Sequence, residues 1–343
     1  MKLQKNKKKK SYILFFTTAL LFAFLATGCQ IKSLQPISDS RFMLDTIVTI
    51  TLYDSNDQNI LNGAFDLCER YENLLSKTRE SSEIYQFNNR KNNEPITVSD
   101  ETAELLQKGL YYSEVSDGAF DITIAPASEL WDFKSENPSL PNAEELKEKV
   151  KDIGYKNLHL DGNILTSDDP RTQIDLGAIA KGFIADKLKE YLLEEGVTSA
   201  VINLGGNVLC VGNKPDGSNF HIGLQKPFES HSETIETLAI DDLSVVSSGI
   251  YERYFKVDGT LYHHILNPKT GYPYENNLTA VTILSEQSVD GDGLSTTCFS
   301  LGLEKGKKLI ESLDNTYAVF ITKDGQLHYT KGFEQFLASN ENK

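Results

Sequence analysis

The amino-acid sequence predicts an α+β fold of largely antiparallel sheets with flanking helices. Two observations favour this class. Helical periods dominate the first part of the chain, whereas short β-branched segments with hairpin turns follow one another from residue 198 onward. Helices and strands also do not alternate in the βαβ order that a doubly wound sheet requires. Because no linker interrupts residues 41–337, we expect one compact unit with two lobes.

The first predicted elements are one strand followed by three helices. A partly alternating, β-branched segment at 41–53 predicts the strand. Apolar residues recur at helical spacing over 58–76 and 100–116, and Asp100 is the expected N-cap of the second helix. Asn142 begins a capping-box pattern, which predicts a short third helix.

The later elements are mostly strands. A hairpin is expected over 158–165 with its turn at Asp161-Gly162, and a helix over 177–195 is expected to end at Gly196. The remaining predictions are strands at 199–203, 208–211, 221–224 and 243–246, hairpin turns at Asp258-Gly259 and Asp324-Gly325, and helices at about 291–302 and 304–313.

Residues 1–28 have the pattern of an export signal. Six lysines precede the apolar run at 12–25, which is short for a membrane span of about 20 residues. The next residues, Ala26-Thr27-Gly28-Cys29, resemble a bacterial lipobox, in which the Cys becomes the first residue and carries a diacylglycerol. We therefore expect a lipoprotein anchored through Cys29 at the outer face of the cytoplasmic membrane, with 29–40 as its tether. The alternative is a plain anchor helix with an incidental Cys.

The chain is strongly acidic outside this segment. It has 34 Lys and Arg against 49 Asp and Glu, a formal net charge of −15. Residues 1–28 contain six of the lysines and no acid, so the remainder has 28 basic against 49 acidic residues, a net −21. Nucleic-acid binding needs a basic surface that displaces counterions, so we expect no nucleic-acid partner.

Three further cysteines lie in the body of the chain. Cys68 and Cys298 fall in helical patterns and Cys210 in a strand pattern, without CxxC or zinc-ligand spacing. We expect them to be small buried hydrophobic residues.

Three glycine-containing motifs fall between predicted elements. DGAFDITIAP at 117–126 joins a helix end to an apolar segment, which is typical of a helix C-cap and a strand. DLGAIAKG at 175–182 opens a helix after a strand, where free N–H groups and the charge of Lys181 favour an anion. NLGGN at 203–207 marks a turn, a bulge or a place where a ligand meets the backbone. The structural alternative for DLGAIAKG is a tightly packed helix without a ligand. The alternative for NLGGN is a plain turn.

Two more motifs carry polar side chains. HHILNPKTG at 263–271 begins with His263 and His264, which face opposite sides of a strand and so cannot easily share one metal ion. In DGLST, Asp292 and Thr296 are four residues apart and share a helix face, and such oxygen ligands suit Mg²⁺. For the two histidines, the structural alternative is one core and one surface residue. For Asp292 and Thr296, it is a pair that caps the start of a helix.

In this order, the five motifs resemble those of the ApbE family of flavin transferases, over roughly residues 41–335. The resemblance implies two lobes around a nucleotide cleft, with FAD as substrate and Mg²⁺ as cofactor. It also implies transfer of the FMN half of FAD onto a Ser or Thr hydroxyl of an acceptor flavoprotein, an electron-transfer protein, with release of AMP.

The same resemblance implies roles for single residues. Those that match FAD contacts are Met43, Thr78, Ala119, Phe120, Asp121, Asp175, Lys181, Ile265 and Leu266. Those that match magnesium ligands are Asp292, Thr296, the Ala178 carbonyl and, through its backbone, Ser295. A base must take the proton of the acceptor hydroxyl, and Asp292 and His264 are both candidates.

The chain departs from the family pattern at several places. Thr78 stands where a Tyr is common, which removes an aromatic stacking partner and bears on the balance between transfer and hydrolysis. Gly291 and Gly293 stand where alanines are usual, at a cost of roughly 1 kcal/mol each for the helix. Two alternative functions are a Mg²⁺-dependent FAD pyrophosphatase that uses water as acceptor and a non-catalytic FAD-binding lipoprotein.

Overall fold

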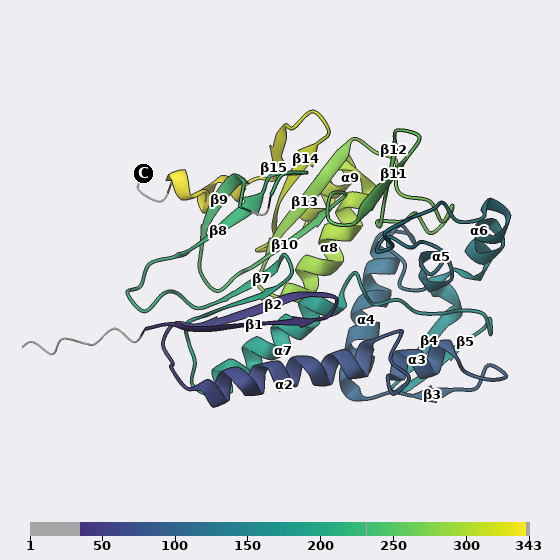
Figure 1. Cartoon of the computed structure of the whole chain (residues 1–343), viewed down its shortest axis with the longest axis horizontal. Coiled ribbons are helices and arrows are strands. Elements are labelled where there is room, and N and C mark those ends of the chain that lie inside the picture. Colours follow the sequence, from purple (N-terminus) through teal and green to yellow (C-terminus); the bar gives the residue numbers. More distant parts are fainter. Residues whose placement is uncertain (1–34, 231, 341–343) are drawn as a thin grey trace, which may run out of the picture. The chain divides into compact units, whose positions relative to one another are not determined.

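The structure is a computed structural model that describes residues 35–230 and 232–340 (Figure 1). Its main strands are β1 (Ile37–Met43), β2 (Thr46–Leu52), β6 (Ala200–Leu204), β7 (Asn207–Val211), β10 (Ser244–Gly249), β13 (Leu278–Ser285), β14 (Tyr317–Thr322) and β15 (Leu327–Tyr329). They form one eight-stranded sheet in the order β1-β2-β6-β7-β10-β13-β14-β15. Every neighbouring pair is antiparallel, which confirms the predicted α+β class.

Three small sheets accompany the main one. Their strands are β3 (Ile96–Thr97), β4 (Leu158–Asp161), β5 (Ile164–Ser167), β8 (Phe220–Gln225), β9 (Thr234–Ile240), β11 (Tyr254–Val257) and β12 (Thr260–His263), paired as β3-β5-β4, β8-β9 and β11-β12. The α-helices are α2 (Gln58–Leu75), α3 (Glu83–Asn88), α4 (Asp100–Val115), α5 (Ala125–Ser128), α6 (Ala143–Lys149), α7 (Ala180–Glu194), α8 (Ser288–Leu301) and α9 (Leu303–Ile310). Short 3₁₀ turns span Val150–Asp152, Tyr155–Asn157, Phe333–Phe336 and Ala338–Asn340.

The main core lies between one face of the large sheet and the helices. Helices α2 and α7 lie side by side along the sheet, and α8 packs against β10 and β13 (Figure 1). On the other face, the β8-β9 hairpin covers a second apolar cluster that includes Phe220 and Leu284. Every residue of β13 is buried, because its side chains alternate between these two cores, as Ile283 and Leu284 do.

The amphipathic helices agree closely with the sequence predictions. Helix α2 occupies Gln58–Leu75 and α4 occupies Asp100–Val115. The N-cap of α4 is Ser99, whose hydroxyl accepts a hydrogen bond from the Thr102 N–H, so the prediction of Asp100 was wrong by one residue. The predicted cap Asn142 is confirmed, since its side chain accepts hydrogen bonds from two N–H groups of α6.

The first predicted strand is in fact a hairpin. Strand β1 ends at Met43 and β2 begins at Thr46, and Leu44 and Asp45 form the turn with φ angles of 53° and 59°. The only local indication of a turn was the Leu44-Asp45 pair. The β-branched residues that flank it led to the prediction of one continuous strand. Strand β1 begins at Ile37, so the folded part starts inside the segment expected to be a tether.

Two predictions around the glycine motifs were wrong. Residues 119–124 form turns rather than a strand, and the short helix α5 follows them. Helix α7 begins at Ala180 instead of 177, and Ile174 before it belongs to no strand. Strands β9 and β13 were not predicted. The 158–165 hairpin is confirmed, with its turn at Gly162-Asn163, one residue later than expected.

Two other sequence predictions concern the cysteines and the N-terminus. Cys68, Cys210 and Cys298 are buried and free, as expected. The predicted export signal and Cys29 lie outside the described residues. Within the described part, no helix has the length and apolarity needed to cross a membrane.

Candidate active site

A cavity of about 910 Å³ is lined by segments that are far apart in the sequence, between Leu44 and Ser300. That volume is near the upper end of the roughly 300–1,000 Å³ range of small-molecule sites. The lining segments are the β1-β2 turn (44–46), the end of α2 with the loop after it (parts of 71–79), parts of 119–134, the start of α7 with its preceding loop (parts of 175–184), Gly205 in the β6-β7 turn, parts of 225–229, parts of 247–254, parts of 264–268 and one face of α8.

Most residues predicted from the sequence line this cavity. They are Thr78, Ala119, Phe120, Asp121, Asp175, Ala178, Lys181, His264, Ile265, Leu266, Asp292 and Thr296. Met43 and Ser295 do not. Met43 ends β1 and packs against the main core, and Ser295 is fully buried with its hydroxyl donating to the Asp292 carbonyl.

Asp292 is buried at the floor of the cavity, with 6% of its surface exposed. Its Oδ2 accepts a hydrogen bond from the Gly182 N–H at 2.6 Å, and its Oδ1 accepts one from Asn207 Nδ2 at 3.0 Å. Burial raises the pKa of Asp292, and the charge of Lys181 and these two hydrogen bonds act against the increase. Asn207 belongs to the NLGGN motif, whose glycine pair is the turn between β6 and β7.

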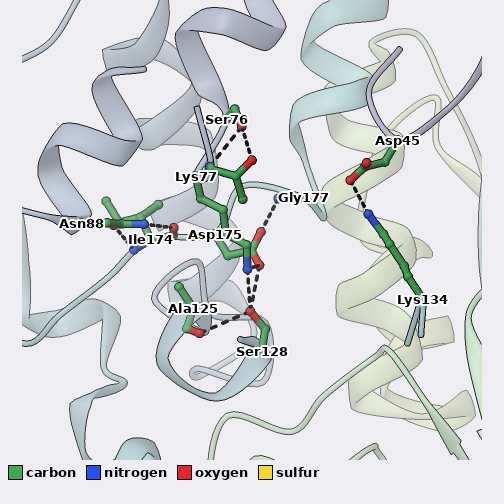
Figure 2. A network of polar contacts seen from close by, with 11 residues as sticks. Asp45, Ser76, Lys77, Asn88, Ala125, Ser128, Lys134, Ile174, Asp175 and Gly177 are labelled. Carbon is green, nitrogen blue, oxygen red and sulfur yellow. Dashed lines mark hydrogen bonds and ion pairs between the residues drawn. The ribbon is translucent and has the colours of Figure 1, made fainter. Parts of the chain in front are cut away.

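Asp175 is held by a network of polar contacts (Figure 2). Lys77 Nζ lies 2.8 Å from its Oδ2, and Ser128 Oγ donates to the same oxygen at 2.9 Å. The Gly177 N–H donates to its Oδ1 at 2.9 Å. Burial acts to raise the pKa of Asp175, but Lys77 and these hydrogen bonds outweigh it and the pKa is lowered. The carboxylate is therefore charged and paired.

Asp121 stabilises the loop that carries it. Its Oδ1 accepts hydrogen bonds from the Thr123 N–H at 2.8 Å and the Thr123 hydroxyl at 2.6 Å. Its Oδ2 accepts one from the Tyr155 N–H at 3.0 Å. Burial raises its pKa. In the same loop, the Ala119 carbonyl accepts a hydrogen bond from the Tyr274 hydroxyl at 2.8 Å.

The two adjacent histidines have different surroundings. His263 is 5% exposed, with Nε2 3.1 Å from the Tyr274 carbonyl and Nδ1 accepting from the Ile265 N–H. His264 faces the cavity, and its buried Nδ1 has no hydrogen-bond partner within the described residues. Burial lowers the pKa of His264 to about 3, so its imidazole is neutral at neutral pH.

The cavity offers oxygen donors of the kind that hold Mg²⁺. Asp292 and Thr296 lie four residues apart on α8, and the exposed Ala178 belongs to the loop before α7. The described residues contain no group of three or more His, Cys, Asp or Glu side chains able to hold a metal. A cation here would therefore depend on one carboxylate, neutral oxygens and substrate phosphates, which fits Mg²⁺.

Sequence reasoning missed several residues of this site. Lys77 gave no signal, because its pairing with Asp175 joins residues 98 positions apart. The aromatic side chains of Trp131 and Phe133, which stack at 5.4 Å, and of Phe228 and Tyr251 were also missed, although all four line the cavity. A single sequence does not reveal such contacts.

Comparison with known proteins identifies the family. The model of the ApbE family matches residues 44–321. The chain belongs to the ApbE family. All predicted FAD and magnesium residues except Met43 fall inside the ApbE match.

Several relatives of this ApbE chain carry the same curated name, FAD:protein FMN transferase. The protein from Klebsiella pneumoniae (strain 342) is 38% identical over 84% of this chain and 89% of its own length. That from Vibrio cholerae (strain O395) is 32% identical over 93% and 98%. That from Treponema pallidum (strain Nichols) is 30% identical over 86% and 87%.

Solved ApbE structures share the fold. The ApbE protein from Thermotoga maritima superimposes with a TM-score of 0.80 at 31% identity, covering 88% of this chain and 99% of that one. The flavin transferase ApbE from Vibrio cholerae gives a TM-score of 0.79 at 27% identity, with coverage of 88% and 99%.

Proposed function

We propose that this chain is an FAD:protein FMN transferase. In this reaction the FMN half of FAD moves onto a Ser or Thr hydroxyl of an acceptor flavoprotein, in a Mg²⁺-dependent step, and AMP leaves. One observation carries the proposal. A single cavity brings together residues from all five sequence motifs, represented by Ala119, Lys181, Gly205, His264 and Asp292. The names of the relatives support the same activity.

The reaction is a phosphoryl transfer, so positioning and charge neutralisation supply most of the catalysis. A new bond forms between the acceptor oxygen and the FMN phosphorus, and the pyrophosphate bond to AMP breaks with its electrons leaving on AMP. Lys181 and the start of α7 line the cavity and would stabilise the negative charge of the phosphates. Mg²⁺, when bound by Asp292, Thr296 and the Ala178 carbonyl, would neutralise pyrophosphate charge.

Of the two candidate bases, we favour His264. Both carboxylate oxygens of Asp292 already accept hydrogen bonds, from Gly182 and Asn207. His264 instead is neutral, lines the cavity and has an unpaired Nδ1 among the described residues. A neutral imidazole with a free ring nitrogen can take the hydroxyl proton, but a pKa of about 3 makes it a weak base in the free enzyme, so this role requires that the bound phosphates raise the pKa of His264.

FAD hydrolysis is the second candidate function. Thr78 lines the cavity where a larger aromatic residue is common in the family, and its hydroxyl lies 3.0 Å from Ser76 Oγ. The shorter side chain leaves room for water, which would act as the acceptor and give free FMN and AMP.

A single incubation with FAD, Mg²⁺ and a candidate acceptor protein distinguishes these functions. A covalent flavin on the acceptor, detected as a mass increase by mass spectrometry, supports the transferase. Free FMN and AMP without labelled acceptor support the hydrolase. Intact FAD would mean that the chain only binds the nucleotide, and would overturn the proposal.

The proposed location is the outer face of the cytoplasmic membrane, through a lipid on Cys29. The support is the lysine-rich, apolar, lipobox-like sequence that precedes the described residues. Cys29→Ser in the full chain should move the protein from the membrane fraction to the soluble fraction or retain it as an uncleaved precursor. Unchanged processing and membrane association would contradict the lipid anchor.

A further inference from the structure

Helices α7 and α8 cap each other through two aspartates. On α7, Asp186 accepts hydrogen bonds from the first N–H groups of α8, those of Ser288 at 2.8 Å and Val289 at 2.9 Å. On α8, Asp292 accepts one from the Gly182 N–H of α7 at 2.6 Å. The residue that precedes α8, Gln287, makes no side-chain capping bond. Asp186 therefore supplies the cap that α8 lacks in its own sequence.

The two helices touch backbone to backbone at this point. A Cβ atom on Gly182 would lie 2.2 Å from the Ser288 carbonyl oxygen and 2.7 Å from the Val289 Cα. Gly182 and Asp186 are four residues apart on one helix face, as are Ser288 and Asp292 on the other. The contact thus fixes the start of α8 against the first turns of α7.

A continuous set of hydrogen bonds links the cap to the site. Besides donating its N–H to Asp186, Ser288 donates its hydroxyl to Asn207 Oδ1 at 2.8 Å. Asn207 Nδ2 in turn donates to Asp292 Oδ1 at 3.0 Å. The Gly182 N–H holds Asp292 Oδ2, and α7 itself connects Gly182 to Asp186. Both oxygens of Asp292 are oriented by this ring.

We propose that Asp186 is a positioning residue that sets the direction of the Asp292 carboxylate in the cavity, although Asp186 does not line the cavity itself. This inference rests on the proposed function for the role of Asp292. Loss of the Asp186 carboxylate leaves N–H groups of α8 without their acceptor. Ser288 and Asn207 then lose their fixed places, and with them the orientation of Asp292.

Asp290, in the first turn of α8, provides a matched control. Its Oδ1 lies 2.7 Å from Lys108 Nζ and accepts a hydrogen bond from the Tyr112 hydroxyl at 2.7 Å, so it joins α8 to α4 instead of α7. Both aspartates contact the first turn of α8 or belong to it. Only Asp186 belongs to the ring that reaches Asp292.

The test compares full-length wild type, Asp186→Asn, Asp186→Glu and Asp290→Asn. Mn²⁺ binding, followed by electron paramagnetic resonance, measures the cation site directly, and FMN transfer is titrated with Mg²⁺. For Asp186→Asn we expect the Mn²⁺ Kd and the half-saturating Mg²⁺ concentration to rise about tenfold. Asp186→Glu should recover part of this loss, and Asp290→Asn should behave as wild type.

Wild-type Mn²⁺ affinity in Asp186→Asn, or equal losses in Asp186→Asn and Asp290→Asn, would overturn the inference. If Asp186→Asn lacks a cooperative thermal transition, Ser288→Ala replaces it, because that variant keeps the backbone bond to Asp186 and removes only the hydroxyl that donates to Asn207 and accepts from Ser244. Weaker Mn²⁺ binding in Ser288→Ala then supports the inference, and unchanged binding overturns it. A wild-type protein that binds Mn²⁺ but labels no acceptor would refute the proposed function alone.

Discussion

Lys77 and Asp175 form an ion pair on the wall of the cavity, with 2.8 Å between Nζ and Oδ2 (Figure 2). Lys77 follows α2, whereas Asp175 lies in the loop that leads into α7. The side chains are only 24% and 20% exposed, so water screens the pair incompletely. The pair neutralises a carboxylate that would otherwise face an anionic substrate.

The first prediction follows from that pair. Lys77→Met keeps the length of the side chain but leaves Asp175 uncompensated on the wall of the cavity proposed to bind FAD. We expect the KM for FAD to rise about tenfold, or about 1.4 kcal/mol, with a smaller change in kcat. Steady-state transfer assays at saturating acceptor measure both constants. Lys151→Met, in an exposed pair with Glu148 away from the cavity, is the control. An unaltered KM for FAD would show that the pair does not serve binding.

The second prediction concerns Asp292. Asp292→Ala removes the carboxylate assigned to Mg²⁺ and the acceptor of the Gly182 N–H. We expect Mg²⁺-dependent FMN transfer to be lost, as judged by the mass of the acceptor after incubation with FAD. Circular dichroism of the variant controls for folding. Unchanged labelling would refute the assigned role of Asp292.

The third prediction is a pH profile for His264. Because burial lowers its pKa to about 3, this imidazole stays neutral throughout pH 5 to 8 in the free enzyme. The ratio kcat/KM should therefore show no acid limb near 6.5, the ordinary pKa of histidine.

Substitution completes the test of His264. His264→Asn should lower kcat by about 10²- to 10⁴-fold if the imidazole is the base. A wild-type limb near pH 6.5 that disappears in His264→Asn would contradict the predicted protonation state. Near-wild-type kcat in the variant would exclude His264 as the base.

The fourth prediction concerns stability in acid. Burial lowers the pKa of His263 to about 4, whereas the unfolded chain has a value near 6.5. The unfolded state thus binds more protons between these values, so the contribution of His263 is full above pH 6.5 and is lost as the pH falls toward 4. The loss amounts to roughly 3 kcal/mol.

Urea unfolding at several pH values checks this figure. The difference in unfolding free energy between wild type and His263→Gln should shrink by that amount between pH 7 and pH 4. Glutamine does not titrate, so its own packing cost is constant across the series. A difference that stays constant with pH would mean that His263 is not held neutral in the fold.

Local patterns predicted much of the fold. Helices α2 and α4 face one core, so their apolar spacing is visible in the sequence. Strand β13 has apolar neighbours on both faces and therefore lacks alternation. In residues 119–124 apolar and polar side chains alternate, as Phe120, Asp121 and Ile122 do, which imitates a strand although the segment forms turns. A strand that is buried on both faces does not show the apolar periodicity on which the predictions depend, whereas a buried segment without regular structure here shows it.

Residues of the candidate site could be predicted only when they lie within a recognisable sequence motif. Asp292 and Lys181 were found in this way, and the structure places both on the cavity. Lys77 and Asp186 were not, because their partners are distant in sequence and no local pattern indicates them. The wrong start of α7 has the same origin, since the turn at 177–179 depends on Asp175 and its contacts.

The bond between Gly182 and Asp292 joins residues 110 positions apart. Contacts of such high sequence separation carry a large loop-closure entropy and form late, after the local helices and hairpins. A chain that lacks its last third, or one still emerging during synthesis, has no complete cavity, because residues such as His264 and Asp292 are missing. Binding of FAD thus reports completion of folding, and flavin fluorescence during refolding would follow the final step of assembly.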